Sequence, residues 1–140
     1  MATAKNAVDA ASAMYAIRYF ISLSQRQAIR DAVQGEEGEF FADKLVELQT
    51  IIEWMPKLYE TDGQGDGAVA HLHYFIQNGW DWYITEKDVE DHQDQAFGLI
   101  NGHEVELWYI SIDELIGVGA ELDLYWTPKT LGDIRKELKD

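Results

Sequence analysis

Two histidines, His71 and His73, stand two residues apart in a segment whose pattern predicts a β-strand. Because successive side chains of a strand point to opposite faces, both imidazoles would project from the same face. Imidazole and carboxylate groups bind divalent metals, and Glu86 or Asp88 at the end of the next predicted strand could complete a site. His71, His73 and Glu86 would then form the centre of a metal-assisted hydrolase. In the alternative interpretation the strand is an ordinary one, its imidazoles are hydrogen-bonded or solvated, and the chain holds no cofactor.

Other patterns that could support catalysis are incomplete. The glycine-rich segment 62–67 places Asp62, Gln64 and Asp66 at the first three ligand positions of a calcium loop, but His73 stands where the bidentate glutamate belongs. The segment also runs from a predicted helix into a predicted strand, the reverse of a phosphate-binding loop. Cysteine is absent, and no serine lies in a nucleophile-elbow pattern. We therefore interpret the segment as a flexible connector, and the sequence favours no catalytic residue.

Aromatic residues are dense in the second half of the chain, and most of them should fill a core between a sheet and a helix. Neighbours in a regular strand point to opposite faces, so one residue of Trp108–Tyr109 and one of Tyr125–Trp126 could be exposed. An exposed ring bordered by carboxylates is typical of a protein-binding hot spot. The residues that we expect to contact a partner are Trp82, Trp108, Tyr125, Trp126, Glu104 and Glu106.

Helices are predicted throughout the N-terminal part of the chain. Residues 7–21 contain neither Pro nor Gly, and Ser24 with Gln27 forms a capping-box pattern that begins a second helix. A third, longer helix begins around Glu36, and Pro56 should kink or end it because proline lacks an amide donor. The apolar face of this long helix comprises Phe41, Leu45, Leu48, Ile52, Met55 and Tyr59.

Strands are predicted in the second half. Two hairpins are expected: residues 69–76 pair with 80–85, and residues 95–100 pair with 104–110 across the turn signal Asn101–Gly102.

The chain closes with a short helix, a strand and a further helix. Ser111 and Glu114 form a second capping box at the start of the short helix. Residues 122–126 have the pattern of the last strand, and Thr127–Pro128 or Thr130 begins the closing helix.

This order, helices first and strands second, is typical of the α+β class. We predict that the long helix packs on one face of a curved antiparallel sheet of about five strands, followed by a short C-terminal helix. A single domain, residues 1–140, would comprise a helical part (1–61), a loop (62–67), a mainly β part (68–126) and a helix (129–138).

The net charge of −15 is unevenly distributed along the 140 residues. Residues 36–66, 81–94 and 104–123 carry −7, −5 and −6, whereas the first 35 residues carry +2. An acidic field repels phosphates, so we expect no direct nucleic-acid binding and a host protein with a basic surface as the partner. No run of about 18 apolar residues predicts a membrane helix, and the lack of cysteine suits a reducing compartment. We therefore expect a cytoplasmic protein that binds no membrane.

Four stretches of the second half have distinctive motifs: residues 82–88 (WYITEKD), Phe97–Gly98, residues 106–115 (ELWYISIDEL) and residues 121–128 (ELDLYWTP). On these stretches the chain resembles a domain-of-unknown-function family of plasmid-related proteins, carried on plasmids, integrative elements and phages. Trp108 stands where that family usually has glycine. The resemblance implies a mobile-element context, and it implies no catalytic residue because the family has no established activity.

Three hypotheses about function follow from these patterns. The first is a non-enzymatic, acidic protein-binding module, in its sharpest form a DNA mimic that inhibits a host defence or regulatory protein. The second is an accessory domain whose acidity serves only solubility. The third is the metal-assisted hydrolase. The acidic segments and the mobile-element resemblance favour the first, and the incomplete reactive patterns disfavour an enzyme.

Overall fold

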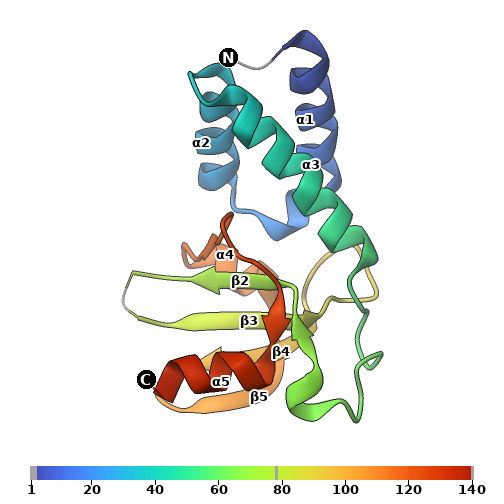
Figure 1. The fold of residues 1–140 in the computed structure, drawn as a ribbon, viewed down its shortest axis with the longest axis vertical. Coiled ribbons are helices and arrows are strands. Elements are labelled where there is room, and N and C mark those ends of the chain that lie inside the picture. Colours follow the sequence, from blue (N-terminus) through green and yellow to red (C-terminus); the bar gives the residue numbers. More distant parts are fainter. Residues whose placement is uncertain (1–2, 78, 140) are drawn as a thin grey trace. The chain divides into compact units, whose positions relative to one another are not determined.

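The computed structural model describes residues 3–77 and 79–139. The chain divides into two compact units, Met1–Trp54 and Met55–Asp140, and the described strands all lie in the second (Figure 1). This architecture confirms the predicted α+β class. The predictions of a single domain and of a long helix packed on the sheet stay predictions, because both concern the placement of one unit relative to the other.

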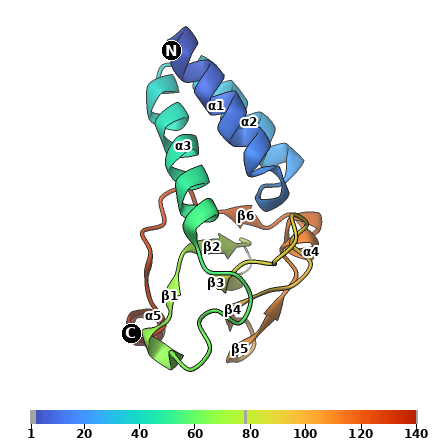
Figure 2. The ribbon, with the colours of Figure 1, turned by 90° about the vertical axis from the view of Figure 1, so that its right-hand side faces the viewer.

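The first unit is helical in its described residues. Its elements are α1 (Ala4–Ala16), the 3-10 turn η1 (Arg18–Phe20), α2 (Leu23–Gln34) and α3 (Gly38–Trp54). α1 and α2 each pack against α3 (Figures 1 and 2). α3 buries Leu45, Leu48 and Ile52 from its predicted apolar face, and it ends two residues before Pro56, as expected.

Polar side chains cap the first two helices. The Thr3 hydroxyl accepts a hydrogen bond from the Asn6 amide (3.1 Å), and the Ser22 hydroxyl accepts one from the Gln25 amide (3.2 Å). The prediction that Ser24 caps α2 is therefore wrong by two residues. Ser22 and Gln25 have the same spacing as Ser24 and Gln27, and the extended backbone at Ser22 (φ −61°, ψ 156°) presents its oxygen to the free amides of the first turn.

In the second unit, five strands form an antiparallel sheet in the order β5-β4-β3-β2-β6. These strands are β2 (Leu72–Phe75), β3 (Asp81–Glu86), β4 (Ala96–Asn101), β5 (Val105–Ile110) and β6 (Glu121–Leu122). β2 to β5 form a meander, and β6 returns to pair with the outer edge of β2. The five-stranded sheet of the sequence prediction is confirmed.

Shorter elements complete this unit. They are η2 (Gly65–Gly67), β1 (Val69–Ala70), α4 (Ile112–Gly117), β7 (Lys129–Thr130) and α5 (Leu131–Lys139). β1 and β7 pair antiparallel as a separate two-stranded ladder. Ser111 caps α4 by accepting from the Glu114 amide (3.2 Å), and Thr130 caps α5 by accepting from the Asp133 amide (3.2 Å). Both helix starts agree with the sequence prediction.

Two predicted strands are shorter than expected. The strand predicted over residues 69–76 is interrupted at His71, whose amide donates to the Ile84 carbonyl (2.8 Å) while the chain passes from the β1 ladder into β2. The strand predicted over residues 122–126 stops after Leu122, because the Asp123 carboxylate accepts from the Tyr125 amide (2.9 Å) and turns the chain.

Both predicted hairpins are present. Asn78 of the first turn lies outside the described residues, and Gly79 beside it has the expected positive φ of 93°. In the second hairpin, Asn101 pairs with Val105, so the loop comprises residues 102–104. The Trp80 ring occupies the space that a side chain at Gly102 would need.

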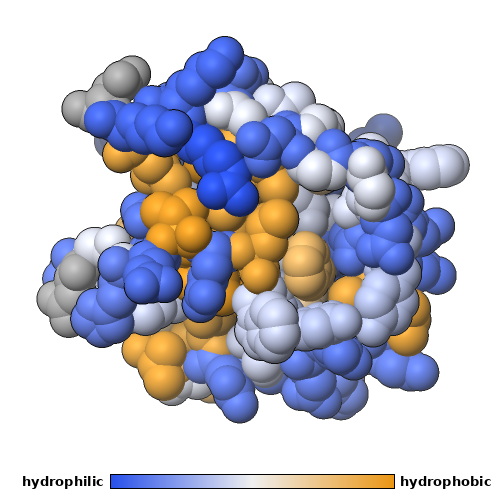
Figure 3. Space-filling view, turned by 90° about the horizontal axis from the view of Figure 1, so that it is seen from below, coloured by the Kyte–Doolittle hydropathy of each residue, from blue (hydrophilic) through white to orange (hydrophobic). Residues whose placement is uncertain are grey.

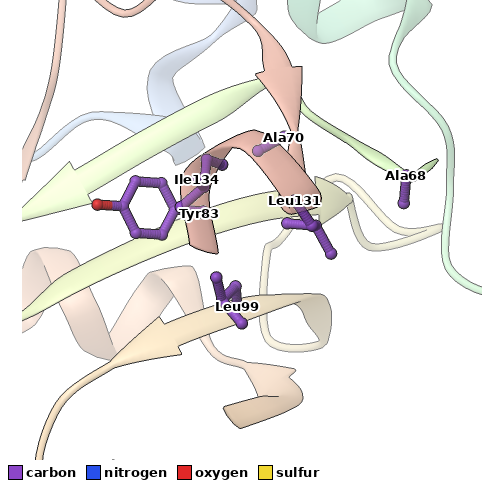
Figure 4. Close-up of a cluster of buried hydrophobic side chains, with 6 residues drawn as sticks. All are labelled: Ala68, Ala70, Tyr83, Leu99, Leu131 and Ile134. Atoms are coloured by element: carbon purple, nitrogen blue, oxygen red, sulfur yellow. The ribbon is translucent and has the colours of Figure 1, made fainter. Parts of the chain in front are cut away.

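The helix α5 covers one face of the sheet. Figure 4 shows Tyr83 of β3 and Leu99 of β4 beneath Leu131 and Ile134 of α5. Burying an aliphatic side chain of this size contributes about 1.5–3 kcal/mol. The complete cluster of buried residues comprises Ala68, Ala70, Tyr83, Leu99, Leu131 and Ile134. Elsewhere, apolar residues reach the surface among hydrophilic ones, as Figure 3 shows for one face.

None of the helices in the described residues has both the length and the apolar character required to cross a membrane.

Candidate partner-binding edge

The three residues of the predicted metal site engage different partners. His71 lies at the break between β1 and β2, and burial lowers the pKa of its imidazole. His73 contacts two aspartates, and Glu86 accepts hydrogen bonds from backbone amides. Over residues 3–77 and 79–139, no group of three or more His, Asp or Glu side chains is arranged to hold a metal ion. The structure therefore does not bring His71, His73 and Glu86 together.

His73 lies between two carboxylates. Its Nε2 is 2.7 Å from Asp81 Oδ1, and its Nδ1 is 2.9 Å from Asp123 Oδ2. The Asn101 amide donates to the other oxygen of Asp81 (3.5 Å). Each ring nitrogen of His73 therefore lies within hydrogen-bond distance of a carboxylate, and both contacts join segments of the strand unit.

Aromatic rings enclose the His73 imidazole. It stacks on Tyr83, with ring centroids 4.8 Å apart, and it also contacts Phe75 (5.8 Å) and Trp126 (5.1 Å). Burial and nearby carboxylates, that of Asp81 foremost, raise the pKa of Tyr83 to about 12. The cluster joins β2, β3 and the chain that follows β6, so we interpret it as a structural clasp.

Part of this clasp could have been found from the sequence. Asp81 pairs with Phe75 across the hairpin, so it lies diagonal to His73 on the same face, and the predicted hairpin contains this information. Asp123 comes from a turn 50 residues away from His73, and no local pattern indicates it.

Glu86 holds a neighbouring segment in place. Its Oε1 accepts from the Tyr59 amide (2.9 Å), and its Oε2 accepts from both the amide (2.8 Å) and the hydroxyl (2.5 Å) of Thr61. Such charge-assisted bonds satisfy a carboxylate that is almost fully buried. Residues 58–61 consequently form a turn, with Tyr59 at φ +76°, so Tyr59 does not continue the apolar face of the long helix as the sequence predicted.

The most exposed part of the sheet is its edge strand β5. It pairs with β4 along one side and with no other described strand along the opposite side. Trp108, opposite Gly98, is 61% exposed on one face, and Tyr109, opposite Phe97, is 36% exposed on the other. An edge strand also presents unpaired backbone N–H and C=O groups that can pair with another chain. We call Glu104, Val105, Glu106, Trp108 and Tyr109, all exposed, the β5 edge.

Two of the edge residues are carboxylates. Glu106 lies on the same face as Trp108 because the two residues are two positions apart in a regular strand. The surrounding sequence reinforces this acidity: ten Asp and Glu residues, and neither Lys nor Arg, lie between Lys87 and Lys129. Neither Glu104 nor Glu106 takes part in an ion pair among the described residues, so the β5 edge combines exposed rings with carboxylates that no Lys or Arg neutralises directly.

The rings of the β5 edge are ordered by neighbouring side chains. Tyr109 makes edge-to-face contacts with Phe97 (5.5 Å) and Trp108 (5.6 Å). Its hydroxyl lies 3.0 Å from that of Tyr59, and this hydrogen bond is the main reason why the pKa of Tyr109 is raised. Side chains that are already ordered lose less entropy when a partner binds.

The structure separates the other residues that the sequence assigned to a partner surface. Trp82 is buried, with 8% of its surface exposed, beside Trp80. Tyr125 is 68% exposed. Trp126 is half-buried, and its Nε1 donates to the Ala70 carbonyl (3.0 Å). Surface positions thus belong to Tyr125 and the β5 edge, whereas Trp82 and Trp126 contribute mainly to packing.

Comparison with known proteins yields no relative: no family model, no curated protein and no solved structure matches the chain. Membership of the plasmid-related family stays a prediction that rests on the sequence motifs.

Proposed function

We propose that the chain is a non-enzymatic, acidic protein-binding module that docks a basic segment of another protein along the β5 edge. The observation that carries this proposal is an edge strand whose outer side faces no other described strand and whose exposed rings, Trp108 and Tyr109, are bordered by Glu104 and Glu106. Backbone pairing along an edge supplies affinity, and the alternating side chains supply specificity.

The glutamates of the β5 edge restrict its pairing to partners that are not acidic, but other devices that block an edge strand are missing from β5. Proteins protect such strands with Lys or Pro residues, with bulges or by keeping them very short. β5 has six residues, VELWYI, with neither Lys nor Pro, and its pairing with β4 runs without a register shift. Since no described strand pairs with the outer side of β5, an extended segment could add there as a further strand.

Charge selects the partner. If two copies paired along β5, their glutamates would repel each other, which disfavours self-association. A segment rich in Lys or Arg would instead gain favourable pairs with Glu104 and Glu106, and the acidic field would accelerate its approach. Trp108 would supply the buried aromatic anchor that protein interfaces favour.

The experiment is a pull-down with the tagged full chain from nuclease-treated host lysate, read by mass spectrometry at low and high salt. We expect a basic protein that is retained at low salt and released at high salt, because exposed charges are screened over about 10 Å at 0.1 M salt. Trp108→Ala and Glu104→Gln/Glu106→Gln should each reduce its recovery at low salt.

Two matched controls separate the β5 edge from the rest of the surface. Trp54→Ala removes a tryptophan that is 83% exposed in the other unit, and Glu90→Gln/Asp91→Asn removes two exposed carboxylates from a loop. Both should leave recovery unchanged. Equal loss in the controls would indicate a diffuse charge effect, and full recovery with both edge variants would contradict docking on β5.

The sharpest form of the proposal is a DNA mimic that occupies the DNA-binding surface of a host defence or regulatory protein. The acidic field and the family resemblance support this form. Duplex DNA should then displace the captured protein from the chain. If the captured protein binds DNA and this chain together, the mimic is excluded while the binding module remains. An empty pull-down at every salt concentration would favour the accessory domain whose acidity serves solubility.

A further inference from the structure

A cavity of about 430 Å³ lies within the helical unit, between α1 and α2. It exists because both helices pack against α3, and because the wall from α1 is built largely of alanines, which leave space. The volume falls in the range of small-molecule sites, about 300–1,000 Å³. Ala10, Met14, Val33 and Leu45 give the cavity a buried apolar lining.

Three arginines, Arg18, Arg26 and Arg30, also line this cavity, and no Asp or Glu does. Arg26 and Arg30 are one turn apart on α2, so they lie on the same side of the helix, where two like charges are mutually unfavourable. No ion pair involves any of the three arginines in the part of the chain that the structure describes. The cavity is thus a cationic site in a protein of net charge −15.

One of these guanidinium groups has an unsatisfied donor. Arg26 Nε is buried, and it has no hydrogen-bond partner among the described residues. Buried donors are nearly always paired, because an unpaired one loses its hydration without compensation. An acceptor that enters the cavity would remove this penalty.

Arg18 is held in position at the same cavity. Its Nη1 donates to the Tyr15 carbonyl (2.7 Å), and its guanidinium lies 3.9 Å from the centroid of the Tyr15 ring and 4.6 Å from that of Tyr19. A guanidinium fixed in this way is ready to bind an oxyanion, because little rotamer entropy remains to be lost.

We propose that this cavity binds a small amphipathic anion: a carboxylate or phosphate monoester at the arginines, with an apolar body against Met14, Val33 and Leu45. The planar guanidinium fork matches both oxyanions in bidentate geometry. This site is independent of the β5 edge, since every lining residue belongs to the helical unit.

The test is isothermal titration calorimetry of the full chain with octanoate, octyl phosphate and 1-octanol. We expect 1:1 binding of at least one of the two anions and much weaker binding of the alcohol. Comparing octanoate with octyl phosphate identifies the preferred oxyanion. The double variant Arg26→Gln/Arg30→Gln should weaken binding of the anions about tenfold or more, because each of its two replacements removes a hydrogen bond between charged groups. Ala11→Trp, at an exposed position of the lining, should block all probes by filling the cavity.

The matched control is Lys136→Gln/Lys139→Gln, which removes two exposed positive charges from α5 and should leave the affinity unchanged. Arg30 is exposed, so Arg30→Gln alone tests the site even if the double variant fails to fold. The proposal is overturned by equal binding of 1-octanol and octanoate, by an unchanged affinity in Arg30→Gln, or by no binding of any probe at millimolar concentration. The proposal would also be overturned if light scattering showed a dimer and the cavity became accessible only when that dimer dissociated.

Discussion

Individual polar residues of the strand unit act as clasps between segments that are distant in the sequence. His73 links Asp81 in β3 to Asp123 beyond β6, and Glu86 binds the backbone of Tyr59 and Thr61. The polar groups of each clasp are at least partly buried. Removing one of these side chains therefore leaves its hydrogen-bond partners unpaired. The side chains that first suggested catalysis therefore hold the sheet and its neighbouring turns together.

The His73 clasp can be measured through stability. His73→Ala removes the hydrogen-bond partner that Asp81 and Asp123 share, and we expect the free energy of unfolding to fall by about 2 kcal/mol, allowing for partial exposure. Urea denaturation is the measurement. In a D81N/D123N background the same replacement should cost less than about 1 kcal/mol. An equal loss in both backgrounds would assign the effect to ring stacking on Tyr83 instead of pairing.

A pair of carboxylates predicts a pH effect. Burial raises the pKa of Asp113 above its usual 3.8, as do the hydrogen bond with Asp94 and its charge. Just above pH 3.8 the folded state therefore binds more protons than the unfolded state. As a result, the free energy of unfolding falls as the pH rises through the raised pKa of Asp113. Asp94→Asn should raise the melting temperature at neutral pH, and the gain should vanish below about pH 4.

The control for this effect is Asp91→Asn, an exposed carboxylate of the same loop, which should leave the pH profile of the melting temperature unchanged. If the gain of Asp94→Asn persisted at low pH, its cause would not be electrostatic.

At the scale of elements, the contact between β3 and β4 depends on Gly98. A Cβ at Gly98 would lie 1.9 Å from the Tyr83 carbonyl oxygen, next to the register shift between Ile84 and Glu86. Gly98→Ala should therefore lower the free energy of unfolding by about 3 kcal/mol, since overpacking against backbone cannot relax by rotamer change. Chemical denaturation measures this loss.

Gly117 in α4 is the matched control, because a Cβ there meets no atom within 4 Å. Gly117→Ala should be neutral or stabilising by about 0.4–1 kcal/mol. A Gly98→Ala variant as stable as the parent would show that the register shift absorbs the added methyl group.

Elements with strong local signals could be predicted from the sequence. Ser111, Thr130 and Pro56 mark helix ends through their own chemistry, and the structure agrees with each. At α2 two equivalent patterns overlap, and only the packing of the helix decides that Ser22, not Ser24, is the cap. β1 and β7 have two residues each, too few to show a periodic pattern. Each is a strand only because it pairs with the other.

Only part of the candidate site could be predicted, because the local sequence does not determine which side chains are exposed. The sequence indicates which residues are aromatic or acidic, but exposure depends on the order of strands in the sheet. Trp108 is exposed because β5 lies at the edge, whereas Trp82 is buried because β3 lies at the centre. The clasp of His73 with Asp123 and the arginine-lined cavity both depend on tertiary contacts that no local pattern contains.

At the scale of the whole molecule, the charge distribution dominates. Residues 55–140 contain 18 Asp and Glu residues and six Lys and Arg residues, so the strand unit repels itself. The melting temperature should rise with NaCl, because the screening length falls from about 30 Å at 0.01 M to about 8 Å at 0.15 M. Differential scanning fluorimetry measures the shift, with equal concentrations of a neutral osmolyte as the control. A melting temperature that falls with added salt would mean that attractive pairs outweigh the repulsion.

After α4 the chain returns to pair with β2 and β1, and this return affects the order in which the strand unit folds. β6 and β7 close on partners far back in the sequence, and Trp126 reaches Ala70 across 56 residues. Such long-range closures slow folding, so the meander β2 to β5 can form while residues 121–130 are still undocked. During that interval β2 has an open side and α5 has not yet covered its core cluster. The docking of this last stretch is thus the step at which mispairing and chaperone binding compete with folding.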